Sequence, residues 1–305
     1  MITAVLEPMP DLFWELVKEK GLQNRFFAFP DINKYKTEIA IIRTKTVFDA
    51  GMMDSFPNIK LIIRAGSGVD NIDIEEAARR NIQVMNTPKA NAQAAAEHTL
   101  AMILSLIKQL PQCKEAVLNG SWKNKLKHSL EISELRVLVV GVGHVGSRVA
   151  GMLTALGAEV RGVDPYLSEI EKENFNIPFC SYKVGLGWCN LVTFHCPLTV
   201  ETKDYFTNDS LSQLKNPIFL INSARGGIIN EDFLLKFSEN KFILGVGIDV
   251  FSTEPTPKFD YFKKKNVIIS PHAGAHTDLA KYRLSAETLR IWERFSDTDI
   301  TKKVQ

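Results

Sequence analysis

The sequence predicts an α/β fold built on two groups of parallel strands. Short apolar runs alternate with helical patterns along most of the chain, which is typical of strand–helix–strand units in a largely parallel sheet. A glycine-rich motif lies between one apolar run and the next helical pattern. The length of 305 residues, at about 100 to 200 residues per domain, predicts roughly two domains.

Five apolar runs form the first group. They cover residues 4–6, 25–27, 39–42, 60–63 and 82–85. We expect these runs to be the strands of one small α/β unit, with a helix over residues 74–80. A longer helical pattern over residues 92–110 carries little polar surface, which predicts a helix buried between layers.

Six apolar runs form the second group. They cover residues 137–140, 159–163, 191–194, 218–221, 243–248 and 267–269. Six strands are the count of a full dinucleotide-binding domain. A last helical pattern over about residues 276–295 follows the sixth run, so we expect it to fold back on the first unit.

The glycine-rich motif is Gly141-Val142-Gly143-His144-Val145-Gly146, a G-x-G-x-x-G pattern directly after an apolar run. In such a loop the first glycine permits a tight turn and the second lets the backbone approach a pyrophosphate. The third allows close packing of strand and helix, and the helix N-terminus attracts the anion. A glycine turn without any ligand is the alternative interpretation.

An acidic residue follows at the expected distance. Asp164 ends the next predicted strand, 23 residues after Gly141, where a carboxylate accepts a hydrogen bond from a ribose 2′-hydroxyl. Asp164 would repel a 2′-phosphate, and the following Pro165 and Tyr166 supply no compensating cation. The pattern therefore favours NAD over NADP, unless this aspartate is incidental.

Three later strands are each followed by a segment with an ionisable side chain. Residues 222–227, 249–255 and 270–274 carry Arg225, Glu254 and His272. Open α/β sheets bind ligands at the carboxyl ends of their strands, so these side chains should meet at one edge. A single histidine or Glu-Pro at a strand end is more often structural, but the three together favour a catalytic site.

With these motifs, the sequence resembles the D-isomer-specific 2-hydroxyacid dehydrogenases from about residue 39 to residue 277. Further matching segments are Arg64-Ala65-Gly66-Ser67-Gly68-Val69-Asp70-Asn71-Ile72-Asp73, Asn86-Thr87-Pro88, Ala96-Glu97-His98 and His195-Cys196-Pro197-Leu198-Thr199. The resemblance implies two Rossmann-like domains with doubly wound parallel sheets. An NAD-binding domain over residues 91–275 is inserted into a flavodoxin-like substrate domain formed by residues 1–90 and 276–305.

The resemblance also implies a reaction. The likeness is strongest to the phosphoglycerate branch of the family, over residues 64–73, 84–88, 164–166 and 271–275. It implies NAD-dependent oxidation of D-3-phosphoglycerate to 3-phosphohydroxypyruvate, at the head of serine synthesis. Glyoxylate or hydroxypyruvate reductase and D-lactate dehydrogenase use the same catalytic set and remain alternatives. A corepressor-like protein that senses NAD(H) is an alternative of another class.

By similarity, Arg225, Glu254 and His272 form the catalytic set. His272 is the acid/base, Glu254 fixes its tautomer and favours the imidazolium, and Arg225 holds the substrate carboxylate and polarises the carbonyl oxygen. The implied cofactor contacts are Gly141, Gly143, His144, Val145, Gly146, Asp164, Cys196, Ser223, Ala224 and Asp249. The expected substrate contacts are Arg43, Arg64, Ser67 and Gly68. At least one of the two arginines, each after a predicted strand, is expected to bind a phosphate, although both could equally be solvated strand-end charges.

Some positions depart from the phosphoglycerate branch. Val47 stands where a lysine is common, and Lys89, placed after Thr87-Pro88, would compensate for it. Residues 182–189 make a poor helix where relatives have a good one. We interpret His98 as an ordinary helix residue and His195 as a strand-end packing residue. The regulatory domain of longer phosphoglycerate dehydrogenases is not expected here.

Composition and charge argue against several other classes of function. The net charge of +2 gives no basic surplus for nucleic acid or an anionic membrane. The four cysteines are spaced like neither a zinc site nor a disulfide framework, so we expect reduced thiols, no metal and a cytoplasmic protein. We expect a homodimer, with the helix over 92–110 and Trp122 at its interface, although core packing explains that helix equally well.

Overall fold

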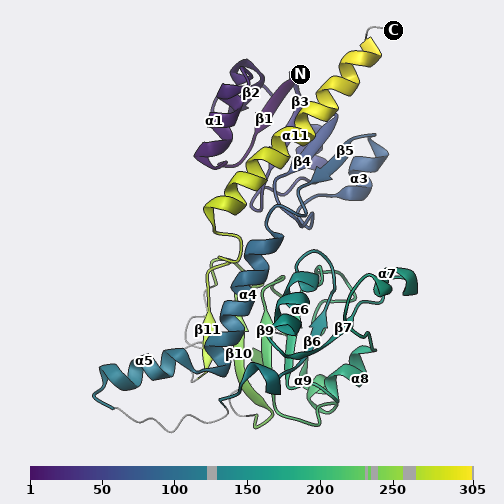
Figure 1. The fold of residues 1–305 in the computed structure, drawn as a ribbon. Coiled ribbons are helices and arrows are strands. Elements are labelled where there is room, and N and C mark those ends of the chain that lie inside the picture. The colour runs from purple at the N-terminus through teal and green to yellow at the C-terminus, as the bar shows by residue number, and fades with distance from the viewer. Residues whose placement is uncertain (122–128, 231–232, 235–239, 257–265, 304–305) are drawn as a thin grey trace. The chain divides into compact units, whose positions relative to one another are not determined.

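A computed structural model describes residues 1–121, 129–230, 233–234, 240–256 and 266–303 (Figure 1), and Trp122 lies outside them. The chain divides into two compact units. One consists of Met1–Asn91 with His276–Gln305, and the other of Ala92–Ala275. These limits lie one residue from the domain boundary expected at 90/91.

The first unit contains a parallel sheet of five strands in the order β2-β1-β3-β4-β5, which is the flavodoxin-like order. The strands are β1 (Ile2–Val5), β2 (Phe26–Ala28), β3 (Thr37–Ile42), β4 (Leu61–Arg64) and β5 (Gln83–Asn86). Its helices are α1 (Asp11–Glu19), α2 (Ala50–Asp54), α3 (Ile74–Arg79) and α11 (Asp278–Lys303), with a 3-10 turn at Gln23–Arg25. All five predicted strands are confirmed to within two residues.

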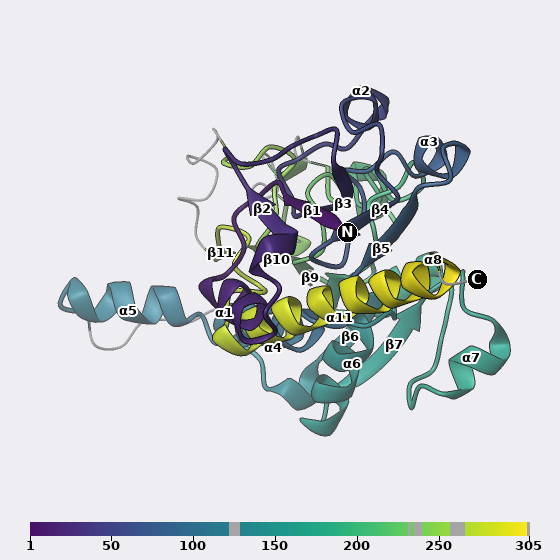
Figure 2. The ribbon, with the colours of Figure 1, turned by 90° about the horizontal axis from the view of Figure 1, so that it is seen from above.

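Helix α11 returns to the first unit, as expected of the last helical pattern. It lies beside α1 on one face of the sheet (Figure 2), where Leu284, Leu289 and Trp292 join the buried core. The indole Nε1 of Trp292 donates a hydrogen bond to Thr3 Oγ1 at 2.7 Å, and both residues are buried. The two ends of the chain are therefore joined in one core.

The second unit contains a parallel sheet in the order β11-β10-β9-β8-β6-β7. Its strands are β6 (Arg136–Val140), β7 (Glu159–Val163), β8 (Leu191–Phe194), β9 (Ile218–Asn222), β10 (Ile243–Ile248) and β11 (Val267–Ile269). Its helices are α4 (Ala92–Ile107), α5 (Leu110–Leu118), α6 (Gly146–Ala155), α7 (Glu169–Glu173), α8 (Tyr182–Leu186) and α9 (Asn208–Leu211), with a 3-10 turn at Ile132–Glu134. The six predicted strands are all present.

A further pairing beside β7 completes the dinucleotide-binding order. Phe179 forms a parallel bridge with Gly162, whose N–H donates to Pro178 O at 2.9 Å and whose carbonyl accepts from Cys180 N at 3.0 Å. Counted as a third strand in chain order, this segment turns the arrangement into 3-2-1-4-5-6 with one more strand at the far edge. No strand was predicted here, because a single pairing residue leaves no apolar run in the sequence.

The helix predicted over 92–110 is α4, which ends three residues earlier than predicted, at Ile107, and a second helix begins at Leu110. The break falls at Gln109, which has a left-handed φ of 49°. Helix α4 packs its buried residues against β9, β10 and α6. Helix α5 buries none of its residues and extends away from the strands of its unit (Figure 1). Without this break, the residues of α5, none of which is buried, would continue in the direction of the buried helix α4.

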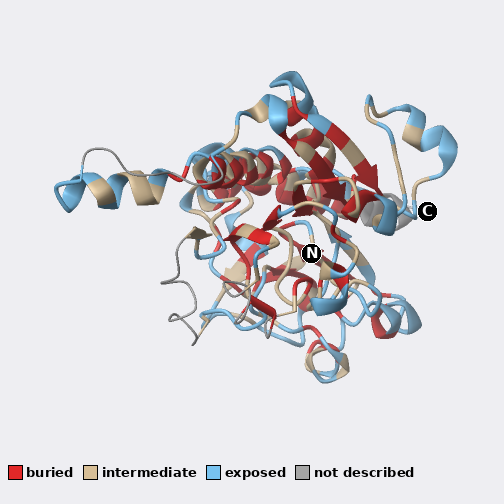
Figure 3. Cartoon of the chain, turned by 90° about the horizontal axis from the view of Figure 1, so that it is seen from below, coloured by how far each residue is buried: buried red, intermediate tan, exposed pale blue. Residues whose placement is uncertain are grey.

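Buried residues lie on the central strands of each sheet and on the helix faces that cover them (Figure 3). Because helices cover both faces of a parallel sheet, its strands are expected to be apolar throughout, and β8 and β9 are buried at every position. Helix α8 covers only five residues and approaches β6 closely at Gly185, where a Cβ would lie 2.3 Å from Leu138 Cδ1. In the part of the chain that the structure describes, no helix is long and apolar enough to cross a membrane.

Candidate active site

The glycine loop joins β6 to α6, and the space around the backbone differs between its three glycines. A Cβ at Gly141, whose φ is +88°, would lie 2.6 Å from Cys196 N. A Cβ at Gly146 would lie 2.0 Å from Gly141 O, so both positions are closed by the chain itself. A Cβ at Gly143 would meet nothing within 4 Å. The open backbone at Gly143 is therefore where a pyrophosphate can approach.

Asp164 lies directly after β7 and is held against this loop. Its Oδ2 accepts a hydrogen bond from Val142 N at 2.9 Å, and its Oδ1 accepts from Tyr166 N at 3.2 Å. A carboxylate has about four lone-pair sites, so acceptor capacity remains for ribose hydroxyls. The Tyr166 hydroxyl donates to the carboxylate of Glu201, which brings a second negative charge near this position. The residues present fit the adenosine half of NAD.

His272 and Glu254 are in direct contact. The Nδ1 of His272 lies 2.7 Å from Glu254 Oε2, and Glu254 Oε1 accepts from Phe251 N at 3.0 Å. A carboxylate accepts only, so Nδ1 carries a proton and Nε2 is the basic nitrogen of the neutral ring. Burial raises the pKa of Glu254, but the hydrogen bonds from His272 and Phe251 outweigh it and hold this pKa below its ordinary value. The pair can accept and return one proton at Nε2.

Arg225 is carried by the loop after β9. Asn222 shapes this loop, because its side-chain amide donates to Arg225 O at 2.8 Å and accepts from Ala224 N at 3.1 Å. The adjacent Gly226 packs on the loop after β10, where its Cβ would lie 2.0 Å from the carbonyl carbon of Phe251. The loops that carry Arg225 and Glu254 are therefore in backbone contact.

Asp249 lies between these loops with its side chain buried. Its carboxylate accepts hydrogen bonds from Ser270 Oγ at 2.5 Å, Ala273 N at 2.8 Å and Gly274 N at 2.9 Å. Its own carbonyl accepts from His272 N at 2.8 Å. Burial raises the pKa of Asp249, but hydrogen bonds, including those from His98 and Ser270, outweigh it and lower this pKa. In the structure this predicted cofactor residue shapes the segment that carries His272.

His98, which was predicted to be an ordinary helix residue, lies beside the segment that carries His272. Its Nε2 lies 2.8 Å from Ser270 Oγ and 3.5 Å from Asp249 Oδ1. One signal was available, since a histidine is unusual in a helix as apolar as α4. The neighbouring Thr99 contacts Ser223 through their hydroxyls at 2.7 Å. Helix α4 thus contributes two polar side chains to the site.

The other predicted cofactor residues lie at the same edge of the second sheet. His144 and Val145 belong to the open loop before α6, and Ala224 precedes Arg225. Cys196 follows β8 beside Gly141, and burial raises the pKa of its thiol to about 11.

His195, which was predicted to be a packing residue, contacts Thr193 Oγ1 at 2.9 Å, and burial lowers its pKa to about 3. A neutral ring is what a packing residue requires.

The four predicted substrate contacts lie at the carboxyl edge of the first sheet. Arg43 follows β3, and its backbone N–H donates to the carboxylate of Glu7 at 2.8 Å, while Nη1 donates to Pro8 O at 3.1 Å. Arg64 ends β4, and a Cβ at Gly66 would lie 1.6 Å from its Nη1, so the guanidinium lies over this glycine. Ser67 and Gly68 follow in the same loop.

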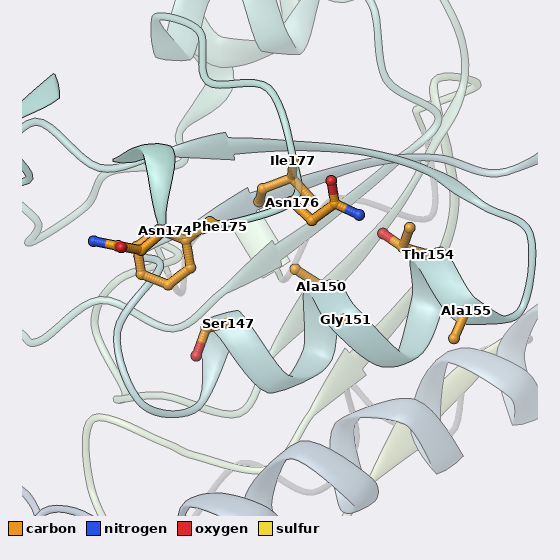
Figure 4. Close-up of a pocket in the computed structure, with 9 residues that line it drawn as sticks. All are labelled: Ser147, Ala150, Gly151, Thr154, Ala155, Asn174, Phe175, Asn176 and Ile177. Carbon is orange, nitrogen blue, oxygen red and sulfur yellow. The ribbon is translucent and has the colours of Figure 1, made fainter. Parts of the chain in front are cut away.

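A separate pocket lies in the second unit (Figure 4). It is formed by one face of α6 and by the segment 174–177. The lining residues are Ser147, Ala150, Gly151, Thr154, Ala155, Asn174, Phe175, Asn176 and Ile177. None of the predicted site residues is among them.

Known proteins are similar to this chain in sequence. Residues 100–274 match the NAD-binding domain of the D-isomer-specific 2-hydroxyacid dehydrogenases. D-3-phosphoglycerate dehydrogenase of Mycobacterium tuberculosis is 32% identical over 84% of this chain and 49% of its own length. The Bacillus subtilis enzyme of that name is 34% identical over 81% and 47%. The chain thus spans about half the length of these curated relatives.

A solved structure is similar over nearly the full chain. D-lactate dehydrogenase from Aquifex aeolicus, complexed with NAD and lactic acid, superposes with a TM-score of 0.85 at 26% identity. The match covers 98% of this chain and 96% of that one.

Proposed function

Because the chain belongs to the D-isomer-specific 2-hydroxyacid dehydrogenases and contains their NAD-binding domain, we propose that it oxidises D-3-phosphoglycerate to 3-phosphohydroxypyruvate. This is the entry reaction of serine synthesis. The contact between His272 Nδ1 and Glu254 Oε2 at 2.7 Å carries the proposal for the reaction type. The names of the curated relatives support the choice of acid.

In this proposal His272 removes the hydroxyl proton. Its Nε2 accepts the proton from the C2 hydroxyl, and the carboxylate of Glu254 stabilises the imidazolium that results. Bound NAD supplies the hydride acceptor for C2. Arg225 holds the substrate carboxylate and polarises the developing carbonyl oxygen. In the reducing direction the same Nε2 returns its proton to that oxygen.

The phosphate is the part of the substrate that separates this acid from its unphosphorylated relatives. We assign its binding to Arg43 and Arg64, the cations that follow β3 and β4. A guanidinium can bind a phosphate through two hydrogen bonds, which Lys cannot do with the same geometry. The exposed Val47 contributes no charge in this loop, and Lys89 is the cation expected to compensate for it.

A substrate panel tests the acid and the cofactor together. Initial rates with D-3-phosphoglycerate, D-glycerate and D-lactate are measured with NAD and with NADP. We expect kcat/KM to be highest for phosphoglycerate with NAD. The variant Arg43→Gln should raise KM for phosphoglycerate by about tenfold or more and leave KM for lactate unchanged, because only the former has a phosphate. A preference for an unphosphorylated acid contradicts the proposed substrate.

The variant His272→Ala tests the catalytic assignment. Turnover of NADH with 3-phosphohydroxypyruvate should fall by about 10²- to 10⁴-fold, the usual contribution of a general acid or base. His276→Gln is the matched control, since this exposed histidine lies four residues along the chain. Unchanged turnover in His272→Ala would mean that the residue is not catalytic. A parent protein that binds NADH but turns over none of the acids would instead favour a dinucleotide-sensing protein.

A further inference from the structure

His98 makes its contacts with the segment that follows β11. The His98 Nε2 atom lies 2.8 Å from Ser270 Oγ, and the two residues are 172 positions apart in the chain. The backbone of the same segment comes close to α4, because a Cβ at Gly274 would lie 3.7 Å from the Cα of Ala95. Helix α4 and the 270–274 segment are thus packed together at His98.

The hydrogen-bond directions in this cluster follow from the chemistry. The Ser270 hydroxyl has one proton, and Asp249 Oδ1 at 2.5 Å can only accept it. Ser270 Oγ must then accept from His98, so Nε2 of His98 carries a proton. That proton also faces Asp249 Oδ1 at 3.5 Å. His98 is therefore a donor at the end of a His98–Ser270–Asp249 chain.

This chain holds the backbone that carries His272. Asp249 accepts from the N–H groups of Ala273 and Gly274 through its carboxylate and from the N–H of His272 through its carbonyl. His272 itself adopts a left-handed φ of 54°, a conformation uncommon for residues other than glycine. A strained conformation persists only where its surroundings over-determine it, and the three N–H bonds to Asp249 do so here.

We propose that His98 is a positioning residue for His272, acting through Ser270 and Asp249 by donating its Nε2 proton to the serine. The assignment rests on the proposed function, in which His272 is the base. Within the described residues, His98 forms no hydrogen bond with Glu254 or His272. Its effect on turnover must therefore pass through Ser270 and Asp249.

Substitutions at position 98 distinguish the effect of losing the hydrogen-bond donor from the effect of losing the volume of the ring. His98→Leu removes the donor, whereas His98→Gln places an amide N–H near the position of Nε2. We expect His98→Leu to lower kcat by about tenfold to 100-fold, since a displaced catalytic group costs that much, and to leave the Kd for NADH within about twofold. His98→Gln should recover most of kcat. Equal losses in both variants, or no loss in His98→Leu, would overturn the proposal.

Glu97→Gln provides the control on the same helix. This exposed residue bonds only to Gln93 Nε2, at 2.8 Å, among the recorded side-chain bonds of the described residues. It should retain the parent's kcat. Rates are measured with whichever acid the substrate panel finds best, so a wrong choice of phosphoglycerate does not affect the result.

A double-mutant cycle tests the route. If His98 acts through Ser270, the variant His98→Leu/Ser270→Ala should lose no more kcat than Ser270→Ala alone. Losses that multiply would show two independent effects and overturn the route. If the chain oxidises none of the acids, the proposed function fails, and nitrogen-15 spectra of the ligand-free protein then decide. His98 protonated at Nε2 supports the assignment, and protonation at Nδ1 alone overturns it.

Discussion

Gly226→Ala should damage the site by forcing apart the two loops that carry Arg225 and Glu254. The new Cβ would lie 2.0 Å from the carbonyl carbon of Phe251, 2.1 Å from its oxygen and 2.3 Å from Ser252 N. Ordinary contact begins at 3.4 Å, so the backbones must separate by 3.4 − 2.0 = 1.4 Å. All three atoms belong to the backbone, and no side-chain rotation relieves the overlap.

The expected losses follow from that shift. A displacement of about 1 Å at catalytic groups costs about 100-fold in rate, so kcat/KM should fall by at least that factor. The Glu254 carboxylate should move with the Phe251 backbone, because Phe251 N donates to Glu254 Oε1. Overpacking should lower the free energy of unfolding by about 1 to 3 kcal/mol. Steady-state kinetics and urea unfolding measure the two effects.

Gly151→Ala is the matched control. This glycine lies in α6, and a Cβ there would meet nothing within 4 Å. The substitution should preserve kcat/KM and raise the free energy of unfolding by about 0.5 to 1 kcal/mol, the advantage of Ala over Gly in a helix. A Gly226→Ala enzyme within about twofold of the parent in kcat/KM would refute the loop contact as described.

Three further predictions concern the cofactor, the pH dependence and the first unit. Asp164→Ser should shift the ratio of kcat/KM for NADP over NAD upward by about tenfold or more, because a 2′-phosphate is no longer repelled; an unchanged ratio in paired assays would contradict the assignment. The lowered pKa of Asp249 stabilises the folded chain above the ordinary value of 3.8, and this stability is lost as the pH falls through the folded-state pKa. The loss of unfolding free energy in Asp249→Asn should therefore shrink as the pH falls from about 5 towards 3, in urea titrations at each pH. Thr3→Val should cost about 1 to 3 kcal/mol in the same assay because it leaves the buried indole N–H of Trp292 unpaired, whereas Thr3→Ser should cost less.

The site residues that could be predicted from the sequence are those that lie in short motifs. The glycine loop, Asp164 and the three strand-end segments each follow an apolar run, so their place at one sheet edge follows from parallel topology. The contact between Glu254 and His272 was expected from the family resemblance and is present at 2.7 Å. Their roles in catalysis stay predictions until the variants above are measured.

Contacts between distant segments were harder to foresee. The role of His98 depends on Ser270. The carboxylate of Asp249, a predicted cofactor contact, also binds the 270–274 backbone, which was not predicted. No local pattern indicates which of several buried polar groups will pair, because pairing depends on the approach of whole elements. The one-residue strand at Phe179 was missed for a similar reason, since its pairing comes from β7.

The sequence by itself determined the two α/β units and the sheet edge at which the predicted site residues lie, because strands covered on both faces must be apolar and parallel strands share one carboxyl edge. Only the tertiary structure decided where α4 ends, which strand completes the second sheet and which side chains hold His272. The end of α4 depends on a left-handed residue at Gln109, and the support of His272 depends on a helix 172 positions away from Ser270. Such contacts arise from packing between elements, which periodicity within one element does not describe.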